Sequence, residues 1–278
     1  MQLIADSGST KVSWRAICDD GSVLSVETVG INPVFMDDAA IEKILKENLV
    51  PVIGTKVEKI FFYGAGVVGG EPSAKLERCF GKVFPGSTCE AVSDVLAAAR
   101  ALCGHKPGIA CILGTGSNSC FYDGENIVRN VRSGGFILGD EGSAACLGKM
   151  FLADYLKGLV PDEVAEPFGA AFKADYMTVV ENVYKKEAPS RYLGSFSPWI
   201  LEWYGKNDYV TRLVQDNFRQ FIERALSRYQ TDKYPVGIVG SFGYACRDIF
   251  REVAQPYGIS ISEIIEAPIE GLLKYHKD

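Results

Sequence analysis

Histidine, basic charge and long apolar runs are scarce in this chain. The 278 residues include two histidines, His105 and His276, which argues against histidine-based catalysis and zinc chemistry. A formal charge of −6 argues against nucleic acid or an anionic membrane as the main partner, because both favour a basic surface. No stretch approaches the ~18 apolar residues of a membrane span. The first residues lack the basic region of a signal peptide. We therefore expect a cytoplasmic protein.

The eight cysteines form no Cys-x-x-Cys pair, and several lie inside apolar runs such as Ile109–Leu113. This arrangement is typical of buried, reduced thiols rather than of a disulfide framework or a zinc site.

Glycine is over-represented, and its clusters follow apolar, strand-like runs. The chain has 29 glycines. Clusters occur at residues 6–11, 114–119 and 240–243. Such small-residue turns leave backbone N–H groups free and let a polyphosphate approach without Cβ clashes. None has the P-loop spacing or the Gly-x-Gly-x-x-Gly spacing of a dinucleotide-binding turn. Each alone could be an ordinary hairpin turn, but their recurrence favours a nucleotide site.

One order of elements occurs twice. Residues 2–30 predict strand, glycine turn, strand, Asp-Gly turn and strand, and residues 109–131 repeat this order. The sequence predicts further strands at 57–63, 236–239 and 259–264. It predicts helices at 37–49, 72–80, 93–102, 142–159, 163–173, 175–187, 197–204, 208–229, 244–256 and from 268. Strands alternate with helices, so the predicted class is α/β. We expect an N-terminal domain at 1–106 and a C-terminal domain with helical insertions at 107–267. The final helix, 268–278, is expected to pack on the first domain.

Four motifs resemble those of one superfamily, that of sugar kinases, heat-shock chaperones and actin. Asp6–Lys11 is similar to its first phosphate motif, Gly114–Ser119 to its second, and Gly240–Gly243 to its adenosine motif. The segment Gly134–Ala144, with Gly-Asp-Glu-Gly-Ser inside it, resembles the N-acetylglucosamine kinase branch, which is grouped with the BadF/BadG/BcrA/BcrD-type ATPases. The resemblance implies two ribonuclease H-like (actin-like ATPase) domains with a nucleotide cleft between them.

The resemblance also implies ATP and Mg²⁺ as cofactors and assigns residues to them. Asp6 is expected to bind Mg²⁺, directly or through water, since Mg²⁺ prefers hard oxygens. The residues expected to bind ATP are Ser9, Thr10, Lys11, Gly114, Thr115, Gly116, Ser117, Gly240, Ser241 and Phe242.

The resemblance makes Asp94 the catalytic base. It would accept a proton from the substrate hydroxyl, for which it must lie within hydrogen-bond reach. The simpler interpretation is a helix N-cap, a role that aspartate often has, and the two are compatible. Asn32, Asp140 and Gly116, with Asp94, are expected to bind the sugar. Asn32 could instead form an Asx turn, and Asp140 could be an acid that the helix dipole favours.

Two departures from the family pattern concern specificity. The stretch from Gly135 to Asp140 is about two residues shorter than in the animal enzymes, and Phe136 replaces a tryptophan there by resemblance, which affects the acetamido pocket. In the adenosine motif, Phe242 replaces a small aliphatic residue.

These observations predict a kinase that phosphorylates the 6-hydroxyl of an amino sugar. N-acetylglucosamine is the first candidate, and glucosamine and N-acetylmuramate are variants. A homodimer is expected. One alternative is the activator ATPase of a 2-hydroxyacyl-CoA dehydratase or benzoyl-CoA reductase, which holds an iron–sulfur cluster between subunits; the scattered cysteines disfavour it. Another is a non-catalytic sugar or nucleotide sensor, which usually carries a DNA-binding helix-turn-helix.

Overall fold

The computed structural model describes residues 1–8, 11–67 and 69–277. The chain forms two compact units. Unit 1 comprises Met1–Lys106, Gly124–Ile127 and Ala267–Asp278, and unit 2 comprises Pro107–Asp123 and Val128–Glu266.

Unit 1 is built on a five-stranded sheet in the order β3-β2-β1-β4-β5. Its strands are β1 Gln2–Ser7, β2 Lys11–Ile17, β3 Val23–Val29, β4 Lys59–Gly64 and β5 Thr88–Ser93. The first three strands form an antiparallel meander, whereas β4 lies parallel to β1 and β5 parallel to β4. The carboxyl ends of β1, β4 and β5 therefore meet at one edge of the sheet.

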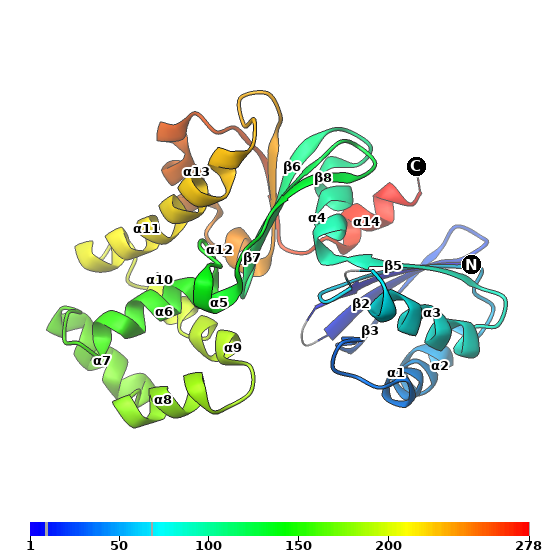
Figure 1. Cartoon of the computed structure of the whole chain (residues 1–278), viewed down its shortest axis with the longest axis horizontal. Coiled ribbons are helices and arrows are strands. Elements are labelled where there is room, and N and C mark those ends of the chain that lie inside the picture. The colour runs from blue at the N-terminus through cyan, green and yellow to red at the C-terminus, as the bar shows by residue number, and fades with distance from the viewer. Residues whose placement is uncertain (9–10, 68, 278) are drawn as a thin grey trace. The chain divides into compact units, whose positions relative to one another are not determined.

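Side chains alternate between the two faces of this sheet, and each face is covered by helices (Figure 1). Leu3, Ala5 and Phe62 belong to the core on one face, whereas Ile4 and Tyr63 belong to a separate cluster on the other. The first face is covered by α1 Asp38–Ile44, a π-helical segment Leu45–Leu49, α2 Val50–Ile53 and α3 Glu71–Val83. The second is covered by α4 Asp94–Cys103 and α14 Ile269–Tyr275.

Unit 2 repeats the topology of unit 1. Its strands are β6 Gly108–Leu113, β7 Ser117–Tyr122, β8 Ile127–Val131, β9 Val236–Val239 and β10 Ile261–Ile265. The order β10-β9-β6-β7-β8 is that of unit 1 read from the other edge. β6 pairs antiparallel with β7 and parallel with β9, as β1 does with β2 and β4. The predicted recurrence of one topology is confirmed.

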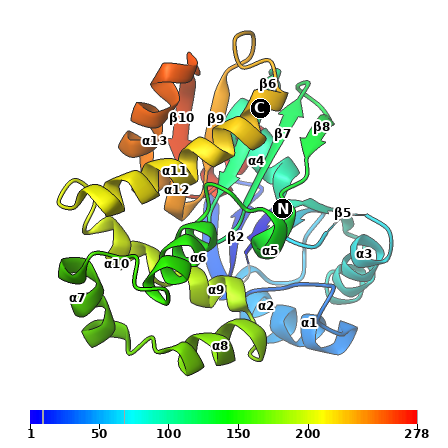
Figure 2. The ribbon, with the colours of Figure 1, turned by 60° about the vertical axis from the view of Figure 1, so that its left-hand side comes forward.

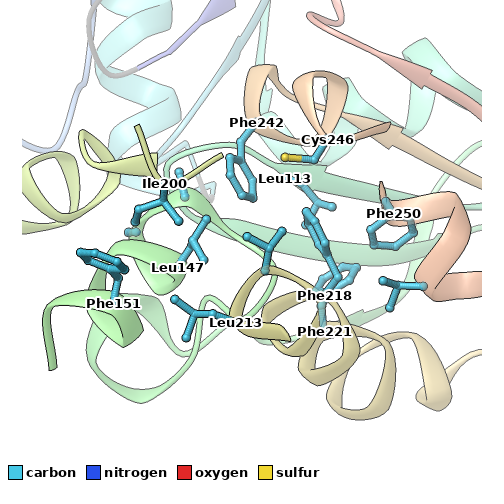
Figure 3. Packing of buried hydrophobic residues seen from close by; sticks show 14 of the residues in the cluster. Leu113, Leu147, Phe151, Ile200, Leu213, Phe218, Phe221, Phe242, Cys246 and Phe250 are labelled. Atoms are coloured by element: carbon cyan, nitrogen blue, oxygen red, sulfur yellow. The ribbon is translucent and has the colours of Figure 1, made fainter. Parts of the chain in front are cut away.

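Helices make up most of the rest of unit 2. They are α5 Gly135–Leu138, α6 Ala144–Tyr155, α7 Asp162–Phe172, α8 Tyr176–Tyr184, α9 Pro189–Gly194, α10 Ser197–Leu201, α11 Asp208–Arg224, α12 Ser241–Ala245 and α13 Arg247–Ala254, with 3₁₀ turns at Leu226–Arg228 and Gln255–Tyr257. Figure 2 shows α11 and α13 side by side. Their buried faces bring Phe218, Phe221 and Phe250 together in the core of the unit (Figure 3).

The α/β class is confirmed, and the differences from the sequence prediction are local. β5, α5 and α9 were not predicted. The helix predicted at 37–49 is divided into α1 and the π-helical segment Leu45–Leu49. Within the part of the chain that the structure describes, no helix is long and apolar enough to cross a bilayer.

Candidate active site

In unit 1, two carboxylates lie at the same edge of the sheet. Asp6, near the end of β1, is paired with Tyr63 of β4, and Tyr63 is paired with Val92 of β5. Asp94 directly follows β5, whose last residue is Ser93. The parallel register therefore brings Asp6 and Asp94, which are 88 positions apart in the chain, to the same edge of the sheet, with β4 between their two strands.

Desolvation disfavours the charged forms of both acids. Desolvation and the negative charge of Asp94 raise the pKa of Asp6 to about 6, and Lys11 lowers it only partly. Desolvation raises the pKa of Asp94, although a backbone N–H of Val95 opposes this. No hydrogen bond to the Asp6 carboxylate comes from residues 1–8, 11–67 or 69–277. Two acidic side chains therefore lie at this edge of unit 1, and the charge of Lys11 offsets their repulsion only in part.

Ser93, not Asp94, caps helix α4. The Ser93 hydroxyl accepts a hydrogen bond from the backbone N–H of Leu96 at 3.3 Å, and its backbone is extended. Asp94 is the first residue of the helix. Because the capping role belongs to Ser93, the Asp94 carboxylate is not required for it. The Asp94 carboxylate is therefore free for the predicted role of catalytic base, which stays a prediction.

Asn32 lies in a loop that is fixed to the end of β1. The Ser7 hydroxyl donates to the carbonyl of Ile31 at 2.9 Å and accepts from its N–H at 3.3 Å. The side-chain oxygen of Asn32 accepts from the N–H of Val34 at 3.0 Å, which is the Asx turn named as the simpler interpretation. No hydrogen bond is formed by its amide nitrogen within the described parts of the chain. This nitrogen remains available as a donor.

The first phosphate motif is described only in part. Ser9 and Thr10 lie outside the described residues. The Lys11 ammonium forms an ion pair with Glu27 at 2.6 Å, and both side chains are exposed. A ligand phosphate would compete with Glu27 for this ammonium.

In unit 2, the loop after β6 exposes backbone donors. Its carbonyls accept hydrogen bonds from the first turn of α6. The carbonyl of Gly114 accepts from the N–H of Ala144 at 3.0 Å, and the carbonyl of Thr115 accepts from the N–H of Ala145 at 3.1 Å. The backbone N–H groups of Thr115 and Gly116 have no hydrogen-bond partner among the described residues. Two adjacent unpaired N–H groups in a glycine-rich turn suit a phosphate oxygen.

Asp140 lies against this loop. Its carboxylate accepts from the N–H of Ser117 at 3.3 Å, and a Cβ on Gly116 would lie 3.0 Å from its other oxygen. The backbone of Asp140 has a left-handed φ of 57°, which is unusual for a residue other than glycine. Burial raises the pKa of this carboxyl, and the Ser117 N–H opposes the rise. The structure thus brings a residue expected to bind sugar onto the second phosphate motif.

Comparison with solved structures identifies the family. No protein-family model and no curated protein sequence matches the chain. A candidate N-acetylglucosamine kinase from Porphyromonas gingivalis is 39% identical, covers 99% of this chain and 98% of its own, and superposes with a TM-score of 0.91. The chain belongs to the N-acetylglucosamine kinase-like family. Its members are phosphotransferases of the sugar kinase class, with the two-domain fold of the actin-like ATPases.

More distant structures agree on the fold of this kinase. A candidate N-acetylglucosamine kinase from Chromobacterium violaceum is 19% identical over 99% of this chain and 98% of its own, with a TM-score of 0.75. A candidate N-acetylmannosamine kinase from Listeria monocytogenes is 16% identical over 99% and 96%, with a TM-score of 0.52.

In the kinase, the predicted adenosine motif is packed against the second phosphate motif. Gly240 has a φ of 131°, and a Cβ there would lie 2.4 Å from the carbonyl oxygen of Leu113, so only glycine fits. The Phe242 side chain is 6% exposed and packs on Phe218 with ring centroids 5.7 Å apart (Figure 3). Phe242 therefore offers a ligand its backbone rather than its ring. Its contact with adenosine stays a prediction.

The shortened stretch from Gly135 to Asp140 contains α5, and a lysine side chain of α6 binds a carbonyl of this helix. The Lys149 ammonium donates to the carbonyl of Phe136 at 2.7 Å. A Cβ on Gly139 would lie 1.8 Å from the Ser133 carbonyl oxygen, so the return of the chain toward Asp140 requires glycine. The ring of Phe136 is half-buried against the core of unit 2. Lys149 was not predicted, and nothing in its spacing indicated this contact.

A buried asparagine that the sequence did not identify holds the Gly-Asp-Glu-Gly-Ser segment. Asn217 on α11 accepts from the N–H of Gly142 at 2.9 Å and donates to the carbonyl of Ser143 at 3.1 Å. It is fully buried. The sequence pattern could have identified it, because Asn217 lies in the apolar stripe of α11, where a buried polar side chain needs hydrogen-bond partners.

The cysteines are free thiols, and most of them are buried. Five are buried, namely Cys79, Cys111, Cys120, Cys146 and Cys246, and all eight are free thiols. Burial raises the pKa of Cys79 and of Cys146 to about 11. No group of three or more histidine, cysteine or acidic side chains in the described ranges could hold a metal ion. These positions do not favour the iron–sulfur activator.

Proposed function

We propose that this chain is an ATP-dependent kinase that transfers the γ-phosphoryl group to the 6-hydroxyl of an amino sugar. N-acetylglucosamine is the first substrate to test, because the name of the 39%-identical relative gives this activity. Glucosamine and N-acetylmuramate are the variants. The observation that carries the proposal is the half-buried Asp94 carboxylate, which the helix does not need as a cap and which lies at the same edge of the sheet as Asp6.

Asp94 would act as the base. The sugar oxygen forms a bond to the γ-phosphorus, the bond from phosphorus to the bridging oxygen of ADP breaks, and Asp94 takes the hydroxyl proton. A raised pKa supports this role, because a carboxylate with a higher pKa accepts a proton more readily. Phosphoryl transfer otherwise depends on positioning and on charge stabilisation.

ATP would be bound mainly by backbone groups. The unpaired N–H groups of Thr115 and Gly116 are suited to phosphate oxygens, and Ser117 completes the turn. From unit 1 we assign Ser9, Thr10 and Lys11 to the phosphates. Gly240, Ser241 and the backbone of Phe242 are assigned to adenosine. Backbone donors explain how a chain with a net charge of −6 binds a polyanion.

The Asp6 carboxylate fits Mg²⁺. It is a hard oxygen donor with no hydrogen bond from the described residues. Desolvation and the charge of Asp94 raise its pKa to about 6, and a bound cation would stabilise the charged carboxylate. A single carboxylate is enough as the protein ligand of Mg²⁺, because Mg²⁺ in nucleotide sites keeps several waters and also binds the phosphates. When bound, Mg²⁺ supplies charge neutralisation to the phosphates.

Two polar side chains are assigned to the sugar. Asn32 can donate from its free amide nitrogen, and Asp140 can accept hydroxyl protons, with Gly116 close beside it. By the family resemblance, Phe136 is the side chain assigned to the acetamido group. Assembly as a homodimer is a further prediction, which light scattering can test.

The test is an assay of ADP release with Mg-ATP and a panel of sugars. We expect N-acetylglucosamine to raise ADP release far above the rate without sugar. Asp94→Asn should reduce turnover by at least about 1,000-fold and leave ATP binding intact. Asp37→Asn is the matched control, because Asp37 caps α1 in the same unit by accepting from the N–H of Ala40 at 2.8 Å, a role that asparagine also fulfils. If no sugar in the panel stimulates ADP release, the proposal is wrong.

A further inference from the structure

Helix α4, which begins with the proposed base, buries mainly small side chains. Its buried residues are Val95, Ala97, Ala98 and Ala99. Alanine offers few atoms for contact, so such a helix is held by close approach of its neighbours rather than by large interlocking side chains. The position of α4 therefore depends on what packs against it.

The C-terminal helix α14 makes that close approach (Figure 1). A Cβ on Gly271 of α14 would lie 2.6 Å from the carbonyl oxygen of Ala101 and 2.8 Å from its Cα. These are backbone atoms of α4 and cannot rotate away, so only glycine permits this distance between the two helices. An alanine here would force the helices apart by about 1 Å, since non-bonded contacts lie near 3.5 Å.

α14 itself is firmly attached to the sheet. Ile269 and Leu272 are buried in a cluster with Ile4 and Tyr63. Glu270 accepts two hydrogen bonds from the guanidinium of Arg15 on β2, at 2.9 and 2.6 Å. Because α14 has these anchors and α4 buries mainly small side chains, a clash at Gly271 should displace α4.

A partly buried polar network joins the same two helices to the sheet. The Arg100 guanidinium on α4 donates to the Tyr63 hydroxyl on β4 at 2.7 Å and to Glu90 on β5 at 2.9 Å. The Tyr63 hydroxyl lies 2.8 Å from Nε2 of His276, which follows α14. The tautomer of His276 decides which of these two atoms donates. Burial lowers the pKa of His276 to about 4, which keeps the ring neutral.

This network is better suited to fixing geometry than to adding stability. The Nε atom of Arg100 is buried and has no partner among the described residues. The desolvation cost of an unsatisfied buried N–H offsets part of the free energy that the ion pair contributes to folding. The arrangement does, however, give α4 a defined rotation and height above the sheet.

We propose that the Gly271–Ala101 contact and the Arg100–Tyr63–His276 network position Asp94 for catalysis. The inference rests on the proposed function, in which Asp94 accepts the hydroxyl proton. Arg100 and Ala101 lie six and seven residues after Asp94, about two helical turns away, so a shift of α4 at this end moves its first residue. A base must lie within about 3 Å of its proton donor, and a displacement near 1 Å can cost up to about 100-fold in rate.

Gly271→Ala is the sharpest test, with Gly81→Ala as its matched control. Both replace a glycine inside a helix of unit 1 with the best helix former. A Cβ on Gly81 of α3 meets nothing within 4 Å, whereas a Cβ on Gly271 meets Ala101. We expect Gly271→Ala to lower kcat roughly 10- to 100-fold with KM for ATP unchanged. Gly81→Ala should leave both constants unchanged.

Tyr63→Phe provides a second variant should Gly271→Ala fold poorly. It keeps the buried ring and removes the oxygen shared by Arg100 and His276. We expect kcat to fall about tenfold and KM for ATP to stay constant.

Two results would overturn the inference: wild-type kcat in both variants, or a fall in kcat that comes with an equal rise in KM for ATP and a lower Tm. Failure of the proposed function can be told apart from failure of this inference. If Asp94→Asn stays active, Asp94 is not the base; if Asp94→Asn is inactive while Gly271→Ala and Tyr63→Phe are fully active, only the positioning role is wrong.

Discussion

Replacing Asp6 with asparagine is expected to stabilise the ligand-free protein while removing the proposed Mg²⁺ ligand. Burial and the neighbouring Asp94 raise the pKa of Asp6 from its usual 3.8 to about 6. Between these two values the folded state binds more protons than the unfolded state. The free energy of unfolding therefore falls as the pH rises through this window and stays at the lower level above it.

The structure sets the size of this effect. The difference between 3.8 and about 6 corresponds to roughly 3 kcal/mol once the carboxyl is fully charged in both states. Because the carboxyl retains some contact with water, a gain of about 1–3 kcal/mol is expected for Asp6→Asn near pH 8. Near pH 4 the gain should be below about 1 kcal/mol, since the folded carboxyl is already protonated.

Urea unfolding without metal or nucleotide, at about pH 4 and about pH 8, measures this difference. Asp232→Asn is the control, because Asp232 is exposed in a turn of unit 2 and makes no ion pair within the described chain. Its substitution should change stability little at either pH. Asp6→Asn should also lose Mg-ATP-dependent activity. Equal stability of wild type and Asp6→Asn near pH 8, or a gain that does not depend on pH, would refute the reasoning.

Three further predictions concern single positions. Gly148→Ala should cost about 2–3 kcal/mol in urea unfolding, because its Cβ would lie 1.9 Å from the Leu193 carbonyl oxygen and force α6 and α9 apart; unchanged stability would contradict that approach. Asp140→Ala should raise KM for the sugar about tenfold, and more than KM for ATP, in initial-rate measurements; the reverse order would place Asp140 with the nucleotide. The ring of His276, with its pKa of about 4, should stay neutral in NMR titration down to about pH 5; a midpoint near 6.5 would contradict its burial.

Local signals in the sequence were sufficient for much of the fold. The Asp-Gly turns led correctly to the β2–β3 and β7–β8 connections, and the apolar stripe of 208–229 led to α11. The glycine clusters lie where strands end because close backbone approach requires them, as at Gly240 against Leu113.

The features that could not be predicted from the sequence depend on contacts between distant segments of the chain. β5 escaped prediction because Glu90 interrupts its apolar pattern, and Glu90 is there to pair with Arg100. The π-helical turn before Pro51 and the left-handed backbone of Asp140 likewise follow from packing. The same holds for the nearness of Asp6 to Asp94, which needs the parallel register of β1, β4 and β5.

The central claim is that the chain transfers a phosphoryl group to the 6-hydroxyl of an amino sugar. The most direct measurement is ³¹P–¹H correlation NMR of the product formed from Mg-ATP and N-acetylglucosamine. The account predicts one new phosphorus signal coupled to the two protons on carbon 6, and none when Asp94→Asn replaces the wild type. Phosphorus coupled to the proton on carbon 1, or release of inorganic phosphate without any sugar phosphate, would contradict it.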